Sequence, residues 1–146
     1  MEVVAKNITI RAPAQKIFAY LAEPHNYLTI WPGMLEIDDV RRTPTGERRF
    51  RWVRKMFGAR FEGTSESLNY EPAKRIVSKT HGGIDSIISW TLEPHDAETL
   101  VALMFEYQIP APLHHHPAQD VMTQTEHDVE AILAGLKAVV EEPVTV

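Results

Sequence analysis

The chain has 146 residues, of which 44% are hydrophobic, so it is long enough for one buried core and short for two. It contains no cysteine, which excludes a disulfide scaffold, and its formal net charge of -5 argues against a general nucleic-acid-binding surface. No apolar run is long enough to span a membrane, and the N-terminus lacks the basic and apolar regions of a signal peptide. We therefore expect one cytoplasmic domain that spans residues 1–146.

The N-terminal part of the chain predicts a strand followed by two short helices. Residues 3–10 alternate imperfectly between apolar and polar side chains, as in a strand. The apolar residues of the segment 14–21 fall on one helical face, and Pro24 ends that helix. A second short helix around residues 27–31 ends at the Pro-Gly pair that follows it.

The middle of the chain predicts a run of strands. From Met34 to Ile109 the apolar residues recur with a period of two, and turn residues interrupt the pattern at short intervals. The predicted strands cover residues 34–43, 47–57, 59–70, 75–81, 86–93 and 99–109. Because the connections between them are short, neighbouring strands should be antiparallel.

The last long segment, Ala118–Glu142, predicts one amphipathic helix that the sheet is organised around. Pro117 suits its first turn, and Pro143 marks its end. The apolar stripe is expected to consist of Met122, Thr125, Val129, Ile132, Leu133, Leu136 and Val140. The face exposed to water is expected to hold Asp120, Gln124, Asp128, Glu130, Lys137 and Glu141. At about 1.5 Å per residue this helix is long enough to cover a sheet of long strands.

This order of elements and several local motifs resemble the helix-grip, START-like (SRPBCC) superfamily, in particular its polyketide cyclase/dehydrase-like branch. The resemblance rests on residues 8–27 (ITIRAPAQKIFAYLAEPHNY), 31–34 (WPGM), the Glu-Pro at 71–72 before 75–77 (RIV), and 88–94 (ISWTLEP). It implies an α+β fold with a seven-stranded antiparallel sheet wrapped around the C-terminal helix, and two short helices between strands 1 and 2. It also implies a ligand-binding domain, but the superfamily carries many activities.

Strand alternation predicts a cavity between the inner face of the curved sheet and the C-terminal helix. If the charged residues face water, the small residues Gly63, Ser65, Ser67 and Ser78 line the middle of the inner face, where they are too short to reach a helix. The alternative is that they let the helix pack closely. The alternation is irregular between Gly63 and Leu68, and a β-bulge there would reverse which side chains face inward.

Three connections should meet at one end of the sheet, because alternate turns of an antiparallel meander share an end. They are the turn 56–58, the loop 81–85 and the segment 110–117. We expect them to form a mouth that gates the cavity; the alternative is that their glycines only serve hairpin turns.

The histidines at 114–116 suggest a metal site, but adjacent side chains diverge and no spaced ligand motif accompanies them. We expect no metal and no cofactor, and the alternative reading of these histidines is a solvated loop that gains charge below about pH 6.5.

The inward-facing residues predict binding of a small hydrophobic or lipid-like molecule, by a carrier or a sensor. The expected ligand-binding residues are Trp52, Arg54, Phe61, Ser65, His81, Ile88, Trp90, Leu103, Phe105, Tyr107, Met122, Val129 and Leu133. The alternative is a polyketide cyclase/dehydrase-like or hydrolase-like enzyme in the same cavity, with an acid or base among Tyr107, His81, Asp85, Arg54 and the histidines at 114–116. No nucleophile or nucleotide motif is present. We expect no nucleic-acid partner, no integral membrane segment, and a monomer or homodimer.

Overall fold

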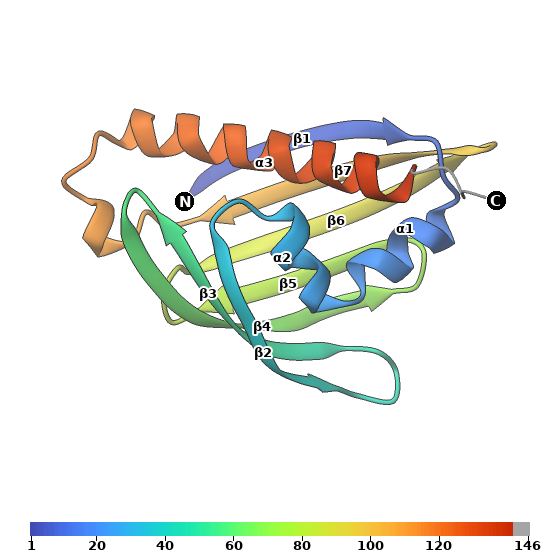
Figure 1. The fold of residues 1–146 in the computed structure, drawn as a ribbon, viewed down its shortest axis with the longest axis horizontal. Helices are drawn as coiled ribbons and strands as arrows, with labels where there is room; N and C mark the ends of the chain where they lie inside the picture. The colour runs from blue at the N-terminus through green and yellow to red at the C-terminus, as the bar shows by residue number, and fades with distance from the viewer. Residues whose placement is uncertain (142–146) are drawn as a thin grey trace.

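The computed structural model of the chain describes residues 1–141 (Figure 1). The elements in chain order are β1 (Glu2–Ile10), α1 (Ala14–Leu21), η1 (Pro24–Asn26), α2 (Tyr27–Ile30), β2 (Met34–Arg42), β3 (Arg48–Met56), β4 (Ala59–Glu71), β5 (Arg75–His81), β6 (Ser86–His95), β7 (Glu98–Tyr107), η2 (Ala111–Leu113) and α3 (Ala118–Val140). Every predicted strand and helix is present. α3 ends two residues before the predicted Glu142, and the predicted stop at Pro143 lies outside the described residues.

The seven strands form one antiparallel sheet in the order β1-β7-β6-β5-β4-β3-β2. Figure 1 shows that α3 lies along β1 and β7, whereas α1 and α2 lie beside it over the rest of the same face. The predicted fold class, with two short helices between the first two strands, is therefore confirmed. Within residues 1–141, no helix combines the length and the apolar character that crossing a bilayer requires.

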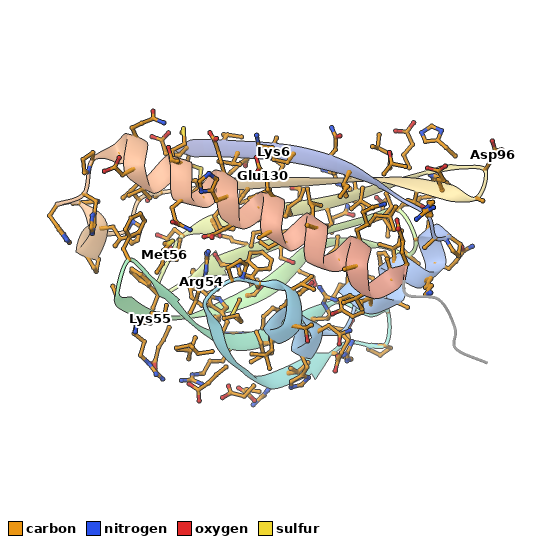
Figure 2. All side chains as sticks on the ribbon, turned by 45° about the horizontal axis from the view of Figure 1, so that its top comes forward. Lys6, Arg54, Lys55, Met56, Asp96 and Glu130 are labelled. Atoms are coloured by element: carbon orange, nitrogen blue, oxygen red, sulfur yellow. The ribbon has the colours of Figure 1, made fainter. Side chains whose placement is uncertain are left out.

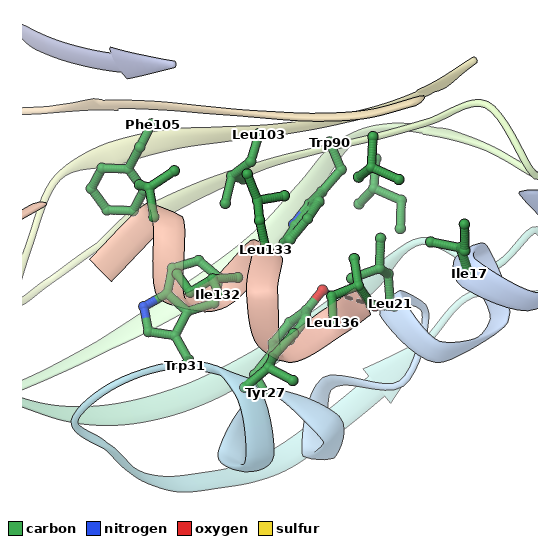
Figure 3. Close-up of a cluster of buried hydrophobic side chains, with 14 of the residues drawn as sticks. Ile17, Leu21, Tyr27, Trp31, Trp90, Leu103, Phe105, Ile132, Leu133 and Leu136 are labelled. Carbon is green, nitrogen blue, oxygen red and sulfur yellow. Dashed lines mark hydrogen bonds between the residues drawn. The ribbon is translucent and has the colours of Figure 1, made fainter. Parts of the chain in front are cut away.

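The main core lies between α3 and the strands beneath it (Figure 3). Trp90 and Leu103 from the sheet, and Ile132, Leu133 and Leu136 from α3, are all buried. These large side chains recur at three- and four-residue steps on the helix and at alternate positions on the strands, so each element contributes one apolar face.

The predicted faces of α3 were wrong at three positions, which are Val121, Met122 and Asp128. Val121 is fully buried and Met122 is only half-buried, because the buried stripe begins at Val121 and reaches Thr125 and Val129 in four-residue steps. Asp128, which was expected in water, is also buried, because it forms an ion pair with an arginine on β3. A buried carboxylate requires such a partner, and an apolar pattern alone does not reveal it.

A β-bulge in β4 reverses the alternation of the strand, so that even-numbered residues face inward after it and odd-numbered residues before it. Ser67 pairs with Ser78, but Asn69 pairs with Val77, so Leu68 is the extra residue and is 54% exposed. Beyond the bulge Tyr70 turns inward, and its ring lies 5.1 Å from the ring of Phe18. The irregular alternation noted in the sequence therefore marks a real bulge.

Arg48 fastens the short helices to the sheet. This arginine on β3 is buried, and its guanidinium donates hydrogen bonds to the Leu21 carbonyl at 2.9 Å and to the Tyr27 hydroxyl at 3.3 Å. The Leu21 carbonyl lies at the C-terminal end of α1, where the helix dipole favours a cation. The start of α2 is thereby held at a fixed place above the strands.

β2 is an irregular edge strand. Its pairing with β3 shifts register between Met34 and Glu36 and again between Asp38 and Arg41, and Asp39 has a positive φ of 51°. The outer face of this region carries exposed ion pairs, including Arg51 with Asp38 at 2.7 Å.

Candidate functional site

A cavity lies between the inner face of the sheet and α2. Its volume is about 50 Å³ when measured as the space open to the centres of water molecules, which is room for a few waters. Its walls are largely aromatic, with side chains from α2, from the residue that follows α2, and from the strands β3, β6 and β7. These are Tyr27, Trp31, Phe50, Trp52, Trp90 and Phe105.

α2 positions two of these rings because of its spacing. Tyr27 begins α2 and Trp31 directly follows its last residue, one turn later, so both point toward the sheet. The Tyr27 ring lies 6.2 Å from that of Phe50, and the Trp31 ring lies 6.3 Å from that of Phe105. The roof of the cavity is therefore a single helical turn that rests on aromatic contacts.

Hydroxyl groups form the floor of the cavity. Ser65, Thr80 and Ser86 occupy facing positions on β4, β5 and β6, and Ser78 lies in the next row beside Ile88. The Thr80 hydroxyl contacts the Ser86 hydroxyl and donates to the Ile84 carbonyl at 2.8 Å. The predicted cavity over small residues is thus present at Ser65 and Ser78.

Gly63 and Ser67, the other two small residues, have different roles. A Cβ at Gly63 would lie 2.5 Å from Cζ2 of Trp52 and 2.6 Å from the His81 carbonyl oxygen, so this glycine accommodates the indole and does not face open space. The Ser67 hydroxyl accepts a hydrogen bond from the Arg48 backbone amide at 2.9 Å. The expectation that all four small residues line the cavity was therefore wrong at these two.

Arg54, labelled in Figure 2, is the charged residue of the cavity lining. It pairs with Asp128 from α3. Its Nη2 donates to Asp128 Oδ2 at 2.7 Å, and its Nε donates to the Pro32 carbonyl at 3.3 Å. Gln124 donates to the other carboxylate oxygen, Oδ1, at 2.9 Å. Burial lowers the pKa of Arg54, and the attraction of Asp128 opposes this shift.

The cavity brings together six of the thirteen expected residues. They are Trp52, Arg54, Ser65, Ile88, Trp90 and Phe105. Leu103, Val129 and Leu133 lie in the core, and Met122 is half-buried on α3 outside the lining. No residue of α3 lines the cavity, because the helix lies over β1 and β7 while α2 covers the middle of the sheet. The expectation of a cavity directly beneath the long helix was therefore wrong.

Three other expected residues also lie outside the lining. Phe61 is buried beside Arg54 on the neighbouring strand. Tyr107 is buried against Phe105, and among residues 1–141 its hydroxyl has no hydrogen-bond acceptor or donor. Burial raises the pKa of Tyr107, and the nearby Thr125 hydroxyl opposes this shift.

The third, His81, faces the opposite side of the sheet, because Thr80 faces inward and strand neighbours alternate. Its Nε2 lies 3.2 Å from the Thr64 hydroxyl and 3.9 Å from a carboxylate oxygen of Glu66. The interpretation of His81 as a polar anchor inside the cavity was therefore wrong.

Eight lining residues were not among the expected binding residues: Tyr27, Trp31, Met34, Phe50, Ser78, Thr80, Ile84 and Ser86. Of these, Ser78 was expected to line the cavity but not to bind the ligand. For Phe50, Thr80 and Ser86 the strand alternation already indicated an inward side chain. For Tyr27 and Trp31 the four-residue spacing was visible, but nothing in the sequence placed α2 above the cavity.

The three predicted connections do meet at one end of the sheet. The Gln108 amide donates to the Asp85 carbonyl at 3.1 Å, and the Phe57 ring lies 4.6 Å from the ring of His116. Phe57 and Gly58 have positive φ angles of 51° and 75°, as a two-residue hairpin turn requires. Of this region, Ile84 reaches the cavity lining; gating by these loops stays a prediction.

The histidines at 114–116 do not converge. His114 Nε2 lies 2.8 Å from the Ile109 carbonyl oxygen, whereas the His115 and His116 rings lie 4.2 Å apart. Across residues 1–141, no group of three or more His, Cys, Asp or Glu side chains is arranged to hold a metal ion.

Comparison with known proteins supplies the family. The family model for polyketide cyclase / dehydrase and lipid transport matches residues 1–141. The chain belongs to this family. No curated protein sequence matches the chain.

Solved structures that resemble this member of the polyketide cyclase / dehydrase and lipid transport family are distant in sequence. A protein from Thermus thermophilus has a TM-score of 0.84 at 18% identity, over 99% of this chain and all of that one. The Zhui aromatase/cyclase from a Streptomyces species has a TM-score of 0.80 at 18% identity, over 99% and 96% of the two chains. A START superfamily protein from Mycobacterium smegmatis has a TM-score of 0.81 at 16% identity, over 96% and 97%. At these identities the likeness establishes the helix-grip fold alone.

Proposed function

We propose that the protein binds a small, mostly apolar molecule in the cavity beneath α2, as a carrier or a sensor. The observation that carries this proposal is the chemistry of the lining, which combines aromatic walls, a hydroxyl floor and one arginine. Within the described chain this lining contains no carboxylate and no imidazole, and Arg54 is already paired with Asp128. A site of this kind favours apolar binding with a few polar anchors.

The small size of the cavity requires that ligand entry enlarges it. A volume of about 50 Å³ for water centres is too small for a lipid-like molecule. α2 is the obvious part to move, since it has four residues and rests on ring contacts. Binding should therefore displace α2 or the rings of Trp31 and Tyr27, a local rearrangement of a common size.

An enzyme in the same cavity, of the cyclase, dehydrase or hydrolase kind, is the second candidate. The Arg54 guanidinium favours it, because N–H donors that are screened from bulk water stabilise the partial negative charge that develops on a carbonyl oxygen. The family description and the resemblance to an aromatase/cyclase support it as well. Against it, Asp128 is the one carboxylate among residues 1–141 that is bonded to a lining side chain, and two hydrogen bonds already occupy its oxygens.

Native mass spectrometry of freshly purified protein, together with titration of a fluorescent apolar probe, tests the binding proposal. We expect near one-to-one binding with little dependence on salt, because apolar burial drives it. Ser65→Phe fills the cavity floor and should abolish probe binding, whereas Thr91→Phe, at an exposed position on β6, should leave it unchanged. Binding that disappears at moderate salt, or that survives in Ser65→Phe, would contradict the proposal. Turnover of a candidate substrate, measured as product, would establish the enzyme instead.

A further inference from the structure

A buried ion pair joins β3 to α3 at the edge of the cavity. Arg54 lines the cavity, whereas Asp128 lies outside the lining on α3. Their side chains are 7% and 10% exposed, so both charges are largely removed from water. The two carboxylate oxygens of Asp128 accept hydrogen bonds from Arg54 and Gln124, which fixes the carboxylate against the guanidinium.

The charge of this pair determines which ligand groups the cavity can bind. The guanidinium contributes +1 to the lining and Asp128 cancels it at 2.7 Å, so the cavity presents hydrogen-bond donors without net charge. A carboxylate entering this space would lose its hydration without gaining an unpaired cation. A neutral carbonyl oxygen can accept a hydrogen bond from a guanidinium N–H and loses far less hydration on entry.

A second donor supports the same ligand chemistry. Trp52 lies two residues before Arg54 on the inner face of β3, and its indole Nε1 has no acceptor among residues 1–141. A buried N–H without an acceptor is unfavourable, and an indole N–H is a neutral donor that suits a neutral acceptor. Trp52 Nε1 is itself closed to water, so it becomes available to a ligand oxygen when ligand entry enlarges the cavity. The lining therefore holds neutral donors and one guanidinium, and that guanidinium is paired. Arg48, the other buried guanidinium of β3, lies outside the lining and is bonded to the Leu21 carbonyl and the Tyr27 hydroxyl.

We propose that Asp128 sets the charge selectivity of the cavity: by neutralising Arg54, it favours apolar ligands with a neutral carbonyl group and excludes carboxylates. The proposal rests on the proposed binding function and adds to it the chemical class of the ligand. Asp128 is thus a specificity residue that acts through Arg54. Removing its charge should convert the cavity into one that prefers an anion.

A matched ligand pair tests the proposal by calorimetry at neutral pH. 2-Acetylnaphthalene and 2-naphthoate share the same rings, but the first carries a neutral ketone and the second a carboxylate. The wild-type protein should bind the ketone at least about tenfold more tightly. Asp128→Asn removes the neutralising charge and should reverse this order. Asp128→Glu keeps the charge and should keep the wild-type order.

Folding of the variants is checked in the same samples. If Asp128→Asn is less stable, 2-naphthoate should raise its melting temperature more than 2-acetylnaphthalene does, because only the anion replaces the lost partner of Arg54. The double variant Arg54→Met/Asp128→Leu carries neither charge and should fold with an apolar pair in place of the ions. It should still prefer the ketone, which separates the effect of the arginine charge from that of the altered shape.

The outcomes separate the two proposals. An unchanged order in Asp128→Asn, or a wild-type preference for 2-naphthoate, would overturn the charge-selectivity proposal while leaving apolar binding in place. Binding of neither ligand to any variant would overturn the proposed binding function, and the selectivity proposal with it. Reversal in Asp128→Asn together with retention in Asp128→Glu is the result that supports it.

Discussion

The inner face of one sheet is used in two different ways. Beneath α3 it carries large apolar side chains such as Val101 and Leu103, which belong to one buried core with Leu133 and Leu136. Beneath α2 it carries hydroxyl groups and a cavity. The two halves share strands. The difference therefore arises from which strand residues face the overlying helix and from the length of that helix. A 23-residue helix fills the space above large side chains, whereas a four-residue helix above serines leaves space.

The ion pair between the two halves should give the largest effect on stability. Arg54→Met leaves the Asp128 carboxylate buried without its partner, and we expect a loss of about 3–5 kcal/mol in the free energy of unfolding, measured by urea denaturation. Arg51→Met, on the same strand but with exposed partners, should cost about 1 kcal/mol or less. Equal losses in the two variants would mean that the Arg54 pair is not screened from water.

Truncating an apolar side chain should cost more stability in the half beneath α3 than in the half beneath α2. Leu136→Ala, in the fully buried part of α3, should cost about 2–5 kcal/mol because it leaves a new cavity. Ile88→Ala should cost clearly less, because this side chain is half-buried and already borders open space. Similar losses in urea denaturation would contradict the distinction between the halves.

Filling the open half should be tolerated. We expect Ser65→Phe to leave the melting temperature unchanged or raised, since the ring enters space that already exists. In a close-packed core the same change would cost roughly 1–3 kcal/mol, so a melting temperature lowered by several degrees would place Ser65 against protein atoms. Thr91→Phe on the exposed face is the control.

Removing the buried hydroxyl of Tyr107 should have a smaller effect on the free energy of unfolding, and it should stabilise the protein where the truncations above destabilise it. Because the Tyr107 hydroxyl is buried without a partner in the described chain, Tyr107→Phe should leave stability unchanged or raise it by up to about 1 kcal/mol. A clear loss in thermal denaturation would reveal a hydrogen bond of this hydroxyl, for example one that it donates to the Thr125 hydroxyl oxygen.

The smallest effect concerns the far end of the packed half. The Lys137 ammonium and the Arg11 amide hold the pKa of Glu141 below its ordinary value. Its contribution to stability is therefore present at neutral pH and is lost as the pH falls through the lowered pKa in the folded state. Glu141→Gln should flatten the decline of the melting temperature in acid, and an identical decline in the two proteins would exclude this role.

Sequence alone was sufficient for the strands, the helices and their antiparallel arrangement, because period, turn residues and length are local properties. It also located the bulge near Leu68 and the polar floor at Ser65 and Ser78. These features depend on alternation within one strand, which the chain displays directly.

The positions of the helices above the sheet could not be predicted in the same way. Whether α2 or α3 lies above Ser65 depends on how layers pack across the whole fold, and no local pattern encodes it. For the same reason Asp128 was assigned to water: its partner Arg54 is distant in the sequence and appears only when β3 and α3 meet. The assignment of binding residues to α3 was wrong because α2, and not α3, lies above the cavity.

The irregular strand β2 has a consequence for self-association. An exposed sheet edge offers free N–H and C=O groups to a strand from another molecule, and regular edges promote aggregation. The two register shifts of β2 and the left-handed backbone at Asp39 interrupt that row, so a foreign strand finds few consecutive partners. The irregularity of β2 thereby opposes growth of the open sheet in that direction.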